Sequence, residues 1–500
     1  MTETQRTAPS SLSDIFGDRS VALDTKTQQL AVTLAPPSEI RILTDASGGV
    51  YAFWTDIGSR LMMEQISGGA RYTQTVSAGP VVSFAVTQNG DTGLQIGYIK
   101  SRDDQGSPAG VYYRILTGGQ LSAALPVFNS SYFRSIKTGA SGVSVASSGH
   151  GTVVVAWDDP YQGRGFYAHS VDDGKTWTAP KPVSSTGLAV QAHVAYTPNS
   201  EFMLIWRDPA AGACVLMQAR SNDGMNTWTS PQRVLSGISR CPERWNFTKV
   251  AADQMWLLGM PASVSPETAS QTNQVVSDQA AIALWNNSTW TAQASLNLSF
   301  YDEAISRTLS LTCVNVALSS NALSMVGCDT KGDVWFVRSQ VNPKELAPSL
   351  VRSWSAINVL SQAALGSINA GSLGQVDGYP ALTTDAHGKM YALWSQPVLA
   401  GTSKISIFAS VWESQTWSQA VQVLDSPSTD QNSGNGDFVT LAQQPSLSSD
   451  NADRLHAVWV SGPGGVLYYS KVTQNNALSA QDWSIPVALP IPSHLVNWPK

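Results

Sequence analysis

A short pattern built on tryptophan recurs along the chain and constrains its fold more than any other feature. In each copy a small polar residue or aspartate precedes the tryptophan, serine or threonine follows it, and an aliphatic residue lies six places on. The six tryptophans are Trp177, Trp228, Trp290, Trp354, Trp417 and Trp483, at spacings of 51, 62, 64, 63 and 66 residues. A near-constant period of this length is typical of an array of similar supersecondary units.

A second tryptophan ends a short apolar run in most of these units, as in residues 50–54, 153–157 and 390–394. Glycine, asparagine and aspartate separate neighbouring apolar runs, which predicts four short strands per unit joined by hairpin turns. Eight units can be counted, and they begin near residues 38, 81, 140, 190, 244, 308, 379 and 443. We therefore expect an all-β fold made of one β-propeller with eight four-stranded blades, since blades bury their faces on their neighbours.

Seven blades, or a pair of β-sandwiches, are the alternatives to this architecture. The propeller would occupy residues 38–500, and residues 1–37 would form an N-terminal extension. Residues 20–34 alternate between apolar and polar like one further strand, which could brace the closure of the ring.

Two turns between the third and fourth strands carry a sharper signature. Residues 170–177 read Ser-Val-Asp-Asp-Gly-Lys-Thr-Trp and match the Asp-box Ser-x-Asp-x-Gly-x-Thr-Trp, and residues 221–228 match it except that Gly224 comes one place early. In such a turn the aspartate binds its own backbone, glycine accepts a positive φ, and the tryptophan packs beneath. The pattern resembles the sialidase-like, or BNR-repeat, β-propellers. That family contains hydrolases, lyases, lectins and adhesins, so the resemblance implies the fold and leaves open whether this chain is an enzyme.

Each four-stranded unit has two kinds of connection. One face, here called the turn face, carries the connections between first and second strands and those between third and fourth strands. The Asp-boxes also lie on this face. The remaining connections share the opposite face, here called the loop face, and the long ones are residues 125–142, 260–279, 360–380 and 424–444. Long loops on a rigid scaffold are usually functional, and in the family the Asp-box face lies opposite the ligand site. We expect a ligand to bind at the loop face.

Arg41 is the most specific candidate for that site. It lies 13 residues before Trp54, and Ser144, His193, Ala381 and Ser446 occupy the same place before the equivalent tryptophans, which puts all five on first strands beside the centre. Arg41-Ile42 resembles the Arg-Ile-Pro motif of sialidases, whose arginine triad clamps a sugar carboxylate. The resemblance implies that Arg244 and Arg307, each expected to open a later blade, complete the triad. It also implies Tyr301 with Glu303 as nucleophile pair and Asp56 as acid.

Aromatic and charged residues of the loop face could also bind a sugar directly, because sugars are held by aromatic platforms with a few polar groups. These candidates are Trp245, Tyr161, Arg164 and Tyr379. The six histidines show no paired metal spacing and no phosphate loop or serine elbow is present, so neither a metal nor a cofactor is expected. A net charge of −6 argues against a nucleic-acid partner, and no apolar run is long enough for membrane insertion.

We therefore expect a glycan- or surface-recognising propeller of lectin or adhesin type, with a carbohydrate or glycoconjugate as partner. An exo-acting glycoside hydrolase resembling a sialidase is one alternative, and a structural propeller assembled into a larger surface structure is another. The low charged fraction of 13% favours an extracellular or particle-surface location, although no signal peptide is visible.

Two further expectations concern stability. Trp177 and Trp228 should be buried between the strands of their units, so that replacement by alanine costs about 3–5 kcal/mol. Cys214 with Cys241 is the better disulfide candidate, whereas Cys313 and Cys328 should face each other across a hairpin as buried thiols.

Overall fold

The computed structural model describes residues 41–489, apart from short breaks and longer gaps at residues 261–278, 339–357, 361–379 and 426–441, and it describes two short strands before residue 41. The described residues form an all-β fold, which confirms the expected class. Two single-turn 3₁₀ helices, η1 (Ser131–Ser135) and η6 (Gln474–Asn476), are the helical segments among them. None of the described helices is long and apolar enough to span a membrane.

The strands form eight antiparallel sheets of four or five strands, numbered here in chain order. Sheet 1 contains β3 (Arg41–Thr44), β4 (Val50–Thr55), β5 (Leu61–Gln65) and β6 (Tyr72–Ser77), and sheet 2 contains β7 (Val81–Asn89), β8 (Gly93–Lys100), β9 (Gly110–Thr117), β10 (Gln120–Leu121) and β11 (Leu125–Asn129). Sheet 3 contains β12 (Val143–Ser147), β13 (Val153–Asp159), β14 (Arg164–Ser170) and β15 (Lys181–Pro182), and sheet 4 contains β16 (Val190–Tyr196), β17 (Glu201–Arg207), β18 (Cys214–Asn222) and β19 (Gln232–Ile238).

The second half of the chain repeats this build. Sheet 5 contains β20 (Arg244–Ala251), β21 (Gln254–Met260), β22 (Gln279–Asn286) and β23 (Thr289–Asn297), and sheet 6 contains β26 (Asn315–Ser319), β27 (Ala322–Cys328), β28 (Val334–Arg338) and β29 (Asn358–Val359). Sheet 7 contains β30 (Ala381–Thr384), β31 (Met390–Pro397), β32 (Ile405–Glu413), β33 (Thr416–Trp417) and β34 (Val421–Leu424), and sheet 8 contains β35 (Ala442–Ser449), β36 (Arg454–Ser461), β37 (Val466–Thr473) and β38 (Val487–Ala488). Two hairpins stand apart from these sheets: β1 (Leu23–Asp24) with β2 (Gln29–Leu30), and β24 (Ser299–Asp302) with β25 (Arg307–Ser310).

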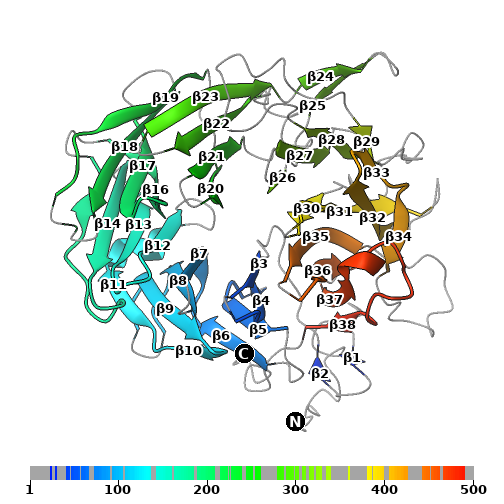
Figure 1. The fold of residues 1–500 in the computed structure, drawn as a ribbon. Helices are drawn as coiled ribbons and strands as arrows, with labels where there is room; N and C mark the ends of the chain where they lie inside the picture. The colour runs from blue at the N-terminus through cyan, green and yellow to red at the C-terminus, as the bar shows by residue number, and fades with distance from the viewer. Residues whose placement is uncertain are drawn as a thin grey trace, which may run out of the picture.

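The sheets follow one another in chain order around a common centre (Figure 1). Each apolar cluster of the core joins two successive sheets: sheets 1 and 2, 2 and 3, 3 and 4, 4 and 5, 6 and 7, and 7 and 8. A further cluster joins Trp54 and Met62 of sheet 1 to Val458 and Leu467 of sheet 8, so the last sheet packs on the first. Apolar burial between neighbours is therefore what holds the sheets together.

The first strands lie at the inner edge, and their register matches the expected one. Arg41, Ser144, His193, Ala381 and Ser446 each pair with the residue immediately before the tryptophan of the second strand. Those five tryptophans are at most 2% exposed. First strands also contact one another, since the Val194 N–H donates to Ser144 Oγ at 3.1 Å and Ser449 Oγ donates to the Thr384 carbonyl at 2.9 Å.

The turns between first and second strands share a hydrogen-bonding pattern that was not expected from the sequence. In five of these turns, the capping residue lies nine positions before the second-strand tryptophan. Its side-chain oxygen accepts a hydrogen bond from the backbone N–H of the residue four positions after it. These acceptors are Asp45, Ser148, Thr197, Asp385 and Asp450, and the residue three places after each has a positive φ. This is a hairpin turn closed by a left-handed residue and capped by a short polar side chain. The sequence signal was the polar residue at this fixed distance from each tryptophan.

The Asp-box turn of residues 170–177 has the expected hydrogen bonds. Asp172 Oδ1 accepts the Thr176 N–H at 2.9 Å, and Ser170 Oγ accepts the Gly174 N–H at 2.8 Å. Hydrogen bonds from Ser170 and then Thr176 lower the pKa of Asp172 to about 2. Gly174 has a φ of +82°, so the turn needs its glycine.

The position of the tryptophan in this turn differs from the expectation of full burial. Trp177 is half-buried, its indole N–H donates to the Gly174 carbonyl at 2.9 Å, and its ring meets Tyr113 of sheet 2 edge-on at 5.2 Å. Trp228 packs in the same way on Tyr167 of sheet 3, at 5.3 Å. These tryptophans therefore fasten one sheet to the preceding sheet, because a third-strand aromatic ring of that neighbour lies directly opposite.

Candidate functional site

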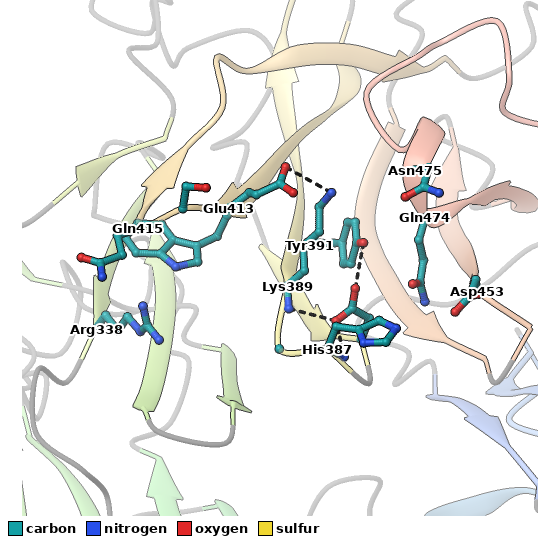
Figure 2. Close-up of a pocket in the computed structure, with 13 residues that line it drawn as sticks. Arg338, His387, Lys389, Tyr391, Glu413, Gln415, Asp453, Gln474 and Asn475 are labelled. Atoms are coloured by element: carbon teal, nitrogen blue, oxygen red, sulfur yellow. Dashed lines mark hydrogen bonds and ion pairs between the residues drawn. The ribbon is translucent and has the colours of Figure 1, made fainter.

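A cavity of about 560 Å³ opens on the turn face, where sheets 6, 7 and 8 meet (Figure 2). Its walls come from the end of β28, from both turns of sheet 7, and from the first turn and η6 of sheet 8. The lining residues are Arg338, Asp385, His387, Gly388, Lys389, Tyr391, Trp412, Glu413, Ser414, Gln415, Asp453, Gln474 and Asn475.

The first turn of sheet 7 forms the middle of the cavity. Asp385 Oδ1 accepts the backbone N–H groups of His387 and Lys389 at 2.8 and 2.9 Å, and the Tyr391 hydroxyl donates to Oδ2 at 3.1 Å. Burial and the neighbouring Asp385 raise the pKa of Tyr391, so its hydroxyl stays protonated and remains a donor. Asp385 thus fixes the backbone that presents His387 and Lys389 to the cavity.

The second turn of sheet 7 supplies an aromatic and charged wall. Lys389 Nζ lies 3.3 Å from the exposed carboxylate of Glu413 and 5.9 Å from the centre of the Tyr391 ring. The Arg338 guanidinium lies 5.4 Å from the ring centre of Trp412, and burial lowers the pKa of this arginine. The exposed pair with Glu413 contributes at most about 1 kcal/mol, so a ligand could displace it at little cost.

The third wall comes from the first turn of sheet 8. Asp450 accepts the Arg454 N–H at 2.9 Å and faces His456 Nε2 at 3.0 Å, and His456 Nδ1 lies 2.9 Å from the Tyr469 hydroxyl. Burial alone would raise the pKa of Asp450, but its bonds with His456 and Arg454 outweigh burial and lower it. Burial lowers the pKa of His456, which is fully enclosed. Asp453, in the same turn, accepts the Gln474 N–H at 2.8 Å through its carbonyl oxygen.

This cavity combines groups that suit a polyhydroxylated ligand. Gln415, Gln474 and Asn475 offer amide donors and acceptors, carboxylates and cations stand beside them, and Trp412 adds an apolar surface. A volume in this range accommodates a small organic ligand. Among the residues that the structure describes, no group of three or more histidine, cysteine, aspartate or glutamate side chains is placed to hold a metal ion.

On the opposite face, Arg41 begins β3 and is exposed at the inner edge of sheet 1. Its guanidinium lies 5.9 Å from the ring centre of Phe84 in sheet 2. Burial, with a smaller contribution from the charge of Arg41, lowers the pKa of His193 to about 4. The structure thus brings residues of sheets 1 and 4 into electrostatic reach of each other near the centre.

A half-buried carboxylate also lies on the loop face, between sheets 3 and 4. Asp158 Oδ1 accepts the Ala192 N–H at 2.8 Å, and the neighbouring Gln191 has a positive φ at an irregularity in β16. Burial raises the pKa of Asp158 to about 7, against the opposing effect of these backbone N–H groups. Arg164, one of the expected ligand residues, begins β14 nearby and is exposed.

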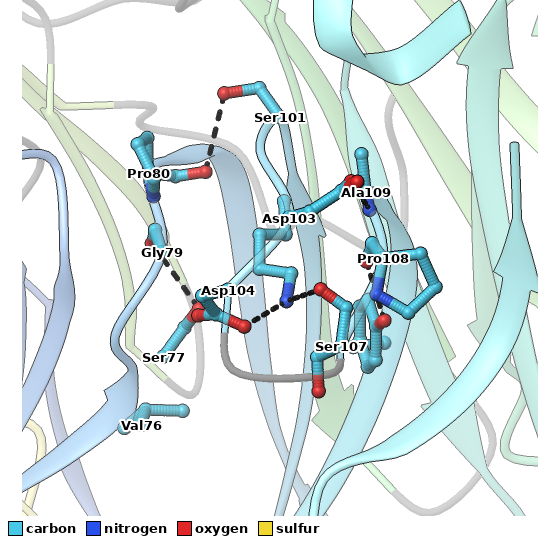
Figure 3. A network of polar contacts seen from close by, with 12 residues as sticks. Val76, Ser77, Gly79, Pro80, Ser101, Asp103, Asp104, Ser107, Pro108 and Ala109 are labelled. Atoms are coloured by element: carbon cyan, nitrogen blue, oxygen red, sulfur yellow. Dashed lines mark hydrogen bonds and ion pairs between the residues drawn. The ribbon is translucent and has the colours of Figure 1, made fainter. Parts of the chain in front are cut away.

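The connection between β8 and β9 is a well-braced part of the loop face (Figure 3). Lys100 is 3% exposed, and its ammonium group donates to Asp104 at 2.6 Å and to the Ser107 carbonyl at 2.9 Å. Asp103 accepts the Ala109 N–H at 2.8 Å and pairs with the exposed Arg134. The stretch 125–142, expected as one long loop, contains β11 and η1 instead.

Arg307 was expected to open a blade, but it begins β25 and pairs with Asp302 of β24. It therefore belongs to a hairpin, as does Tyr301, and not to the first strand of sheet 6, which begins at Asn315. Asp56 is 3% exposed, and its Oδ1 accepts the N–H groups of Gly58 and Arg60 while Oδ2 pairs with the Arg60 side chain. Asp56 therefore caps its turn, and its role as an acid stays a prediction.

The other expected site residues cannot be placed against these. Arg244 and Trp245 lie in β20, with side chains outside the described part of the chain, as are those of Tyr301 and Arg307. Tyr161, Glu303 and Tyr379 lie outside the described residues altogether, as do Cys241 and Cys313. Their roles and the cysteine pairings stay predictions.

Comparisons with known proteins were made at three levels. No protein-family model matches the sequence, and no curated protein matches it. The chain is similar in structure to the NanB sialidase from Streptococcus pneumoniae, with 9% identity, a TM-score of 0.32, and coverage of 90% of this chain and 95% of that chain. It is also similar to the fucose-recognising lectin of Aleuria aurantia, a fungal six-bladed β-propeller, with 9% identity, a TM-score of 0.35, and coverage of 77% and 96%. A leech intramolecular trans-sialidase has 10% identity, a TM-score of 0.30, and coverage of 90% and 92%.

Proposed function

We propose that the chain is a single eight-bladed β-propeller that recognises carbohydrates. Eight sheets of like build, each packed on the next, and the cluster that joins sheet 8 to sheet 1 support one closed ring. The Asp-box turn at residues 170–177, which resembles that of the sialidase-like propellers, supports the same assignment.

The observation that carries the functional proposal is the cavity between sheets 6, 7 and 8. Sugars offer hydroxyl groups that both donate and accept hydrogen bonds, together with apolar C–H surfaces. Amide side chains, carboxylates, cations and the Trp412 wall together meet those requirements within one pocket. These groups support a carbohydrate site on the turn face, in addition to the loop-face site expected from the sequence.

Two other functions compete with recognition. A sialidase-like hydrolase needs Arg41, Arg244 and Arg307 around one cavity, beside Tyr301 and Glu303. The hairpin position of Arg307 does not favour that arrangement. A structural subunit of a larger surface assembly is compatible with the same ring. For the recognition function and for both competing functions, we propose an extracellular or particle-surface location, a glycoconjugate partner, and no nucleic-acid partner.

A glycan array, run beside a fluorogenic sialoside assay on the same sample, tests the proposal. We expect array binding without turnover. Replacing Gln474 and Asn475 by alanine should abolish the array signal if the turn face binds, whereas Arg41→Ala with Arg164→Ala should abolish it if the loop face binds. An empty array would refute carbohydrate recognition, and sialoside turnover would establish the hydrolase instead.

A further inference from the structure

One position in the repeated first turn differs chemically between the sheets. Six residues after the capping aspartate, sheet 1 has Tyr51 and sheet 7 has Tyr391, and each tyrosine hydroxyl donates to its aspartate. In sheet 8 the same position is His456, which faces Asp450 at 3.0 Å. Histidine in water has a pKa of about 6.5 and burial lowers the pKa of His456, so below about pH 6.5 protonation favours an opened form of this turn. Burial instead raises the pKa of Tyr51 to about 12, so the tyrosine turns stay uncharged at this position.

His456 is fully buried and is held at both ring nitrogens. The neutral tautomer with a proton on Nε2 donates to Asp450 and leaves Nδ1 to accept the Tyr469 hydroxyl at 2.9 Å. A second proton on Nδ1 would require the Tyr469 hydroxyl, whose residue is 4% exposed, to turn and accept, so that its own hydrogen no longer donates to Nδ1. Protonation therefore costs either this donation within a buried site or the enclosure of the turn.

The other charged groups around His456 do not offset that cost. Arg454 follows in the same turn and Lys471 lies on β37, and both positive charges oppose protonation, while Asp450 favours it. On the side of sheet 1, Glu64 is fully buried in β5, two residues after Met62, which packs on sheet 8. Its Oε2 accepts the Thr73 hydroxyl at 3.1 Å, so this carboxylate is already engaged within its own sheet.

The turn that His456 holds is also a wall of the cavity. Asp453 has a φ of +54° and contacts η6 through the Gln474 N–H, and both residues line the cavity. We propose that neutral His456 holds the sheet 8 wall in its binding shape and that acidification releases this wall, so that carbohydrate held between sheets 7 and 8 dissociates at low pH. The statement about carbohydrate rests on the proposed function, whereas the release of the wall does not.

Amide hydrogen exchange on the full-length protein without ligand tests the release, with rates corrected for the intrinsic effect of pH. Between about pH 8 and about pH 5, we expect peptides covering 450–456 and 474–476 to lose about tenfold protection. Peptides covering 45–51 and 385–391, whose turns carry tyrosine, should keep theirs. Equal changes in all three turns would overturn the proposal.

Two variants separate this role from a merely structural one. His456→Gln keeps a donor for Asp450 and an acceptor for Tyr469 but cannot titrate, so it should fold and lose the acid response. His387→Gln removes the exposed histidine of the cavity and should keep that response. An acid response that persists in His456→Gln, or disappears in His387→Gln, would refute the assignment. If His456→Gln does not fold, the comparison of the three turns in the natural protein still decides. An empty glycan array would leave these exchange results unchanged, so the two proposals fail separately.

Discussion

Asp385 and Asp45 cap equivalent turns, but only Asp385 lies in the cavity, which makes them a matched pair for testing the site. Asp385 accepts two backbone N–H groups and the Tyr391 hydroxyl. Asp45 accepts the N–H groups of Ser47 and Gly49 at 3.0 and 2.7 Å, the Ser47 hydroxyl at 2.7 Å, and the hydroxyl of Tyr51. Replacing either by asparagine keeps one oxygen acceptor and removes the negative charge.

The expected loss of stability follows from these bonds. A hydrogen bond to a charged group contributes about 1.5–3 kcal/mol and a neutral one about 0.5–1.5 kcal/mol, so each bond to either aspartate weakens by about 1 kcal/mol when the charge is removed. Water replaces part of the loss around the half-buried Asp385 but less of it around Asp45, which is 7% exposed, so we expect about 1–2 kcal/mol for Asp385→Asn and about 2–3 kcal/mol for Asp45→Asn. Unfolding in guanidinium chloride, followed by circular dichroism, measures these losses of stability. The comparison holds where the free energy of unfolding falls with denaturant concentration at the same slope in both variants.

Binding should separate the two variants. Asp385→Asn should weaken binding of the carbohydrate found on the array by about tenfold, because His387, Lys389 and the Tyr391 hydroxyl lose their fixed positions. Asp45→Asn should leave the affinity within about twofold, since its turn lies between sheets 1 and 2. Equal losses of affinity in the two variants would refute the placement of the site on the turn face.

Three further changes test the fold. Asp453→Gly should stabilise the protein by about 0.5–1 kcal/mol in denaturant unfolding, because the position has a positive φ and glycine occupies it in the equivalent turn at Gly388. Trp177→Ala should cost about 2–3 kcal/mol in the same assay, less than a fully buried tryptophan, since the ring is half-buried against Tyr113. Asp158 should titrate near pH 7 by NMR. Because folding raises the pKa of this carboxyl group, its contribution to stability is present below about pH 4 and is lost as the pH rises to about 7. Asp158→Asn should abolish this pH dependence of stability.

The repeat and its register could be predicted because burial imposes them on the sequence. A second-strand tryptophan such as Trp394 fills the space between two sheets, so its spacing reports the sheets directly. The first strands of seven sheets begin within three residues of the expected positions. The sixth is the exception: residues 307–310 alternate like a first strand, but they pair with β24. Alternation of apolar and polar residues predicts that a strand forms, but it does not predict the strand with which it pairs.

The candidate site could not be predicted in this way, because its residues come from three sheets and from both kinds of turn, and no single motif covers them. Arg338, Gln415 and Gln474 are more than 50 residues apart in sequence and have no common spacing from a tryptophan. What the sequence does contain is the capping residue of each first turn. Compared across sheets, that position and the one six places on distinguish Asp385 with Tyr391 from Asp450 with His456.

That comparison also explains why the cavity forms at sheets 7 and 8. In sheet 1 the tyrosine of the same turn is covered by the neighbouring sheet, since the backbone of Gly119 in sheet 2 hydrogen-bonds to Tyr51, and a Cβ on Gly119 would lie 2.5 Å from the Gln65 amide oxygen. In sheet 7 the neighbouring connection is η6, whose Gln474 is held by the sheet 8 turn through Asp453. A two-glycine turn closes over sheet 1, whereas a 3₁₀ turn with amide side chains stands beside sheet 7 and leaves a lined space. One repeated scaffold thus gives a closed junction or a binding cavity, depending on the turn that the next sheet presents.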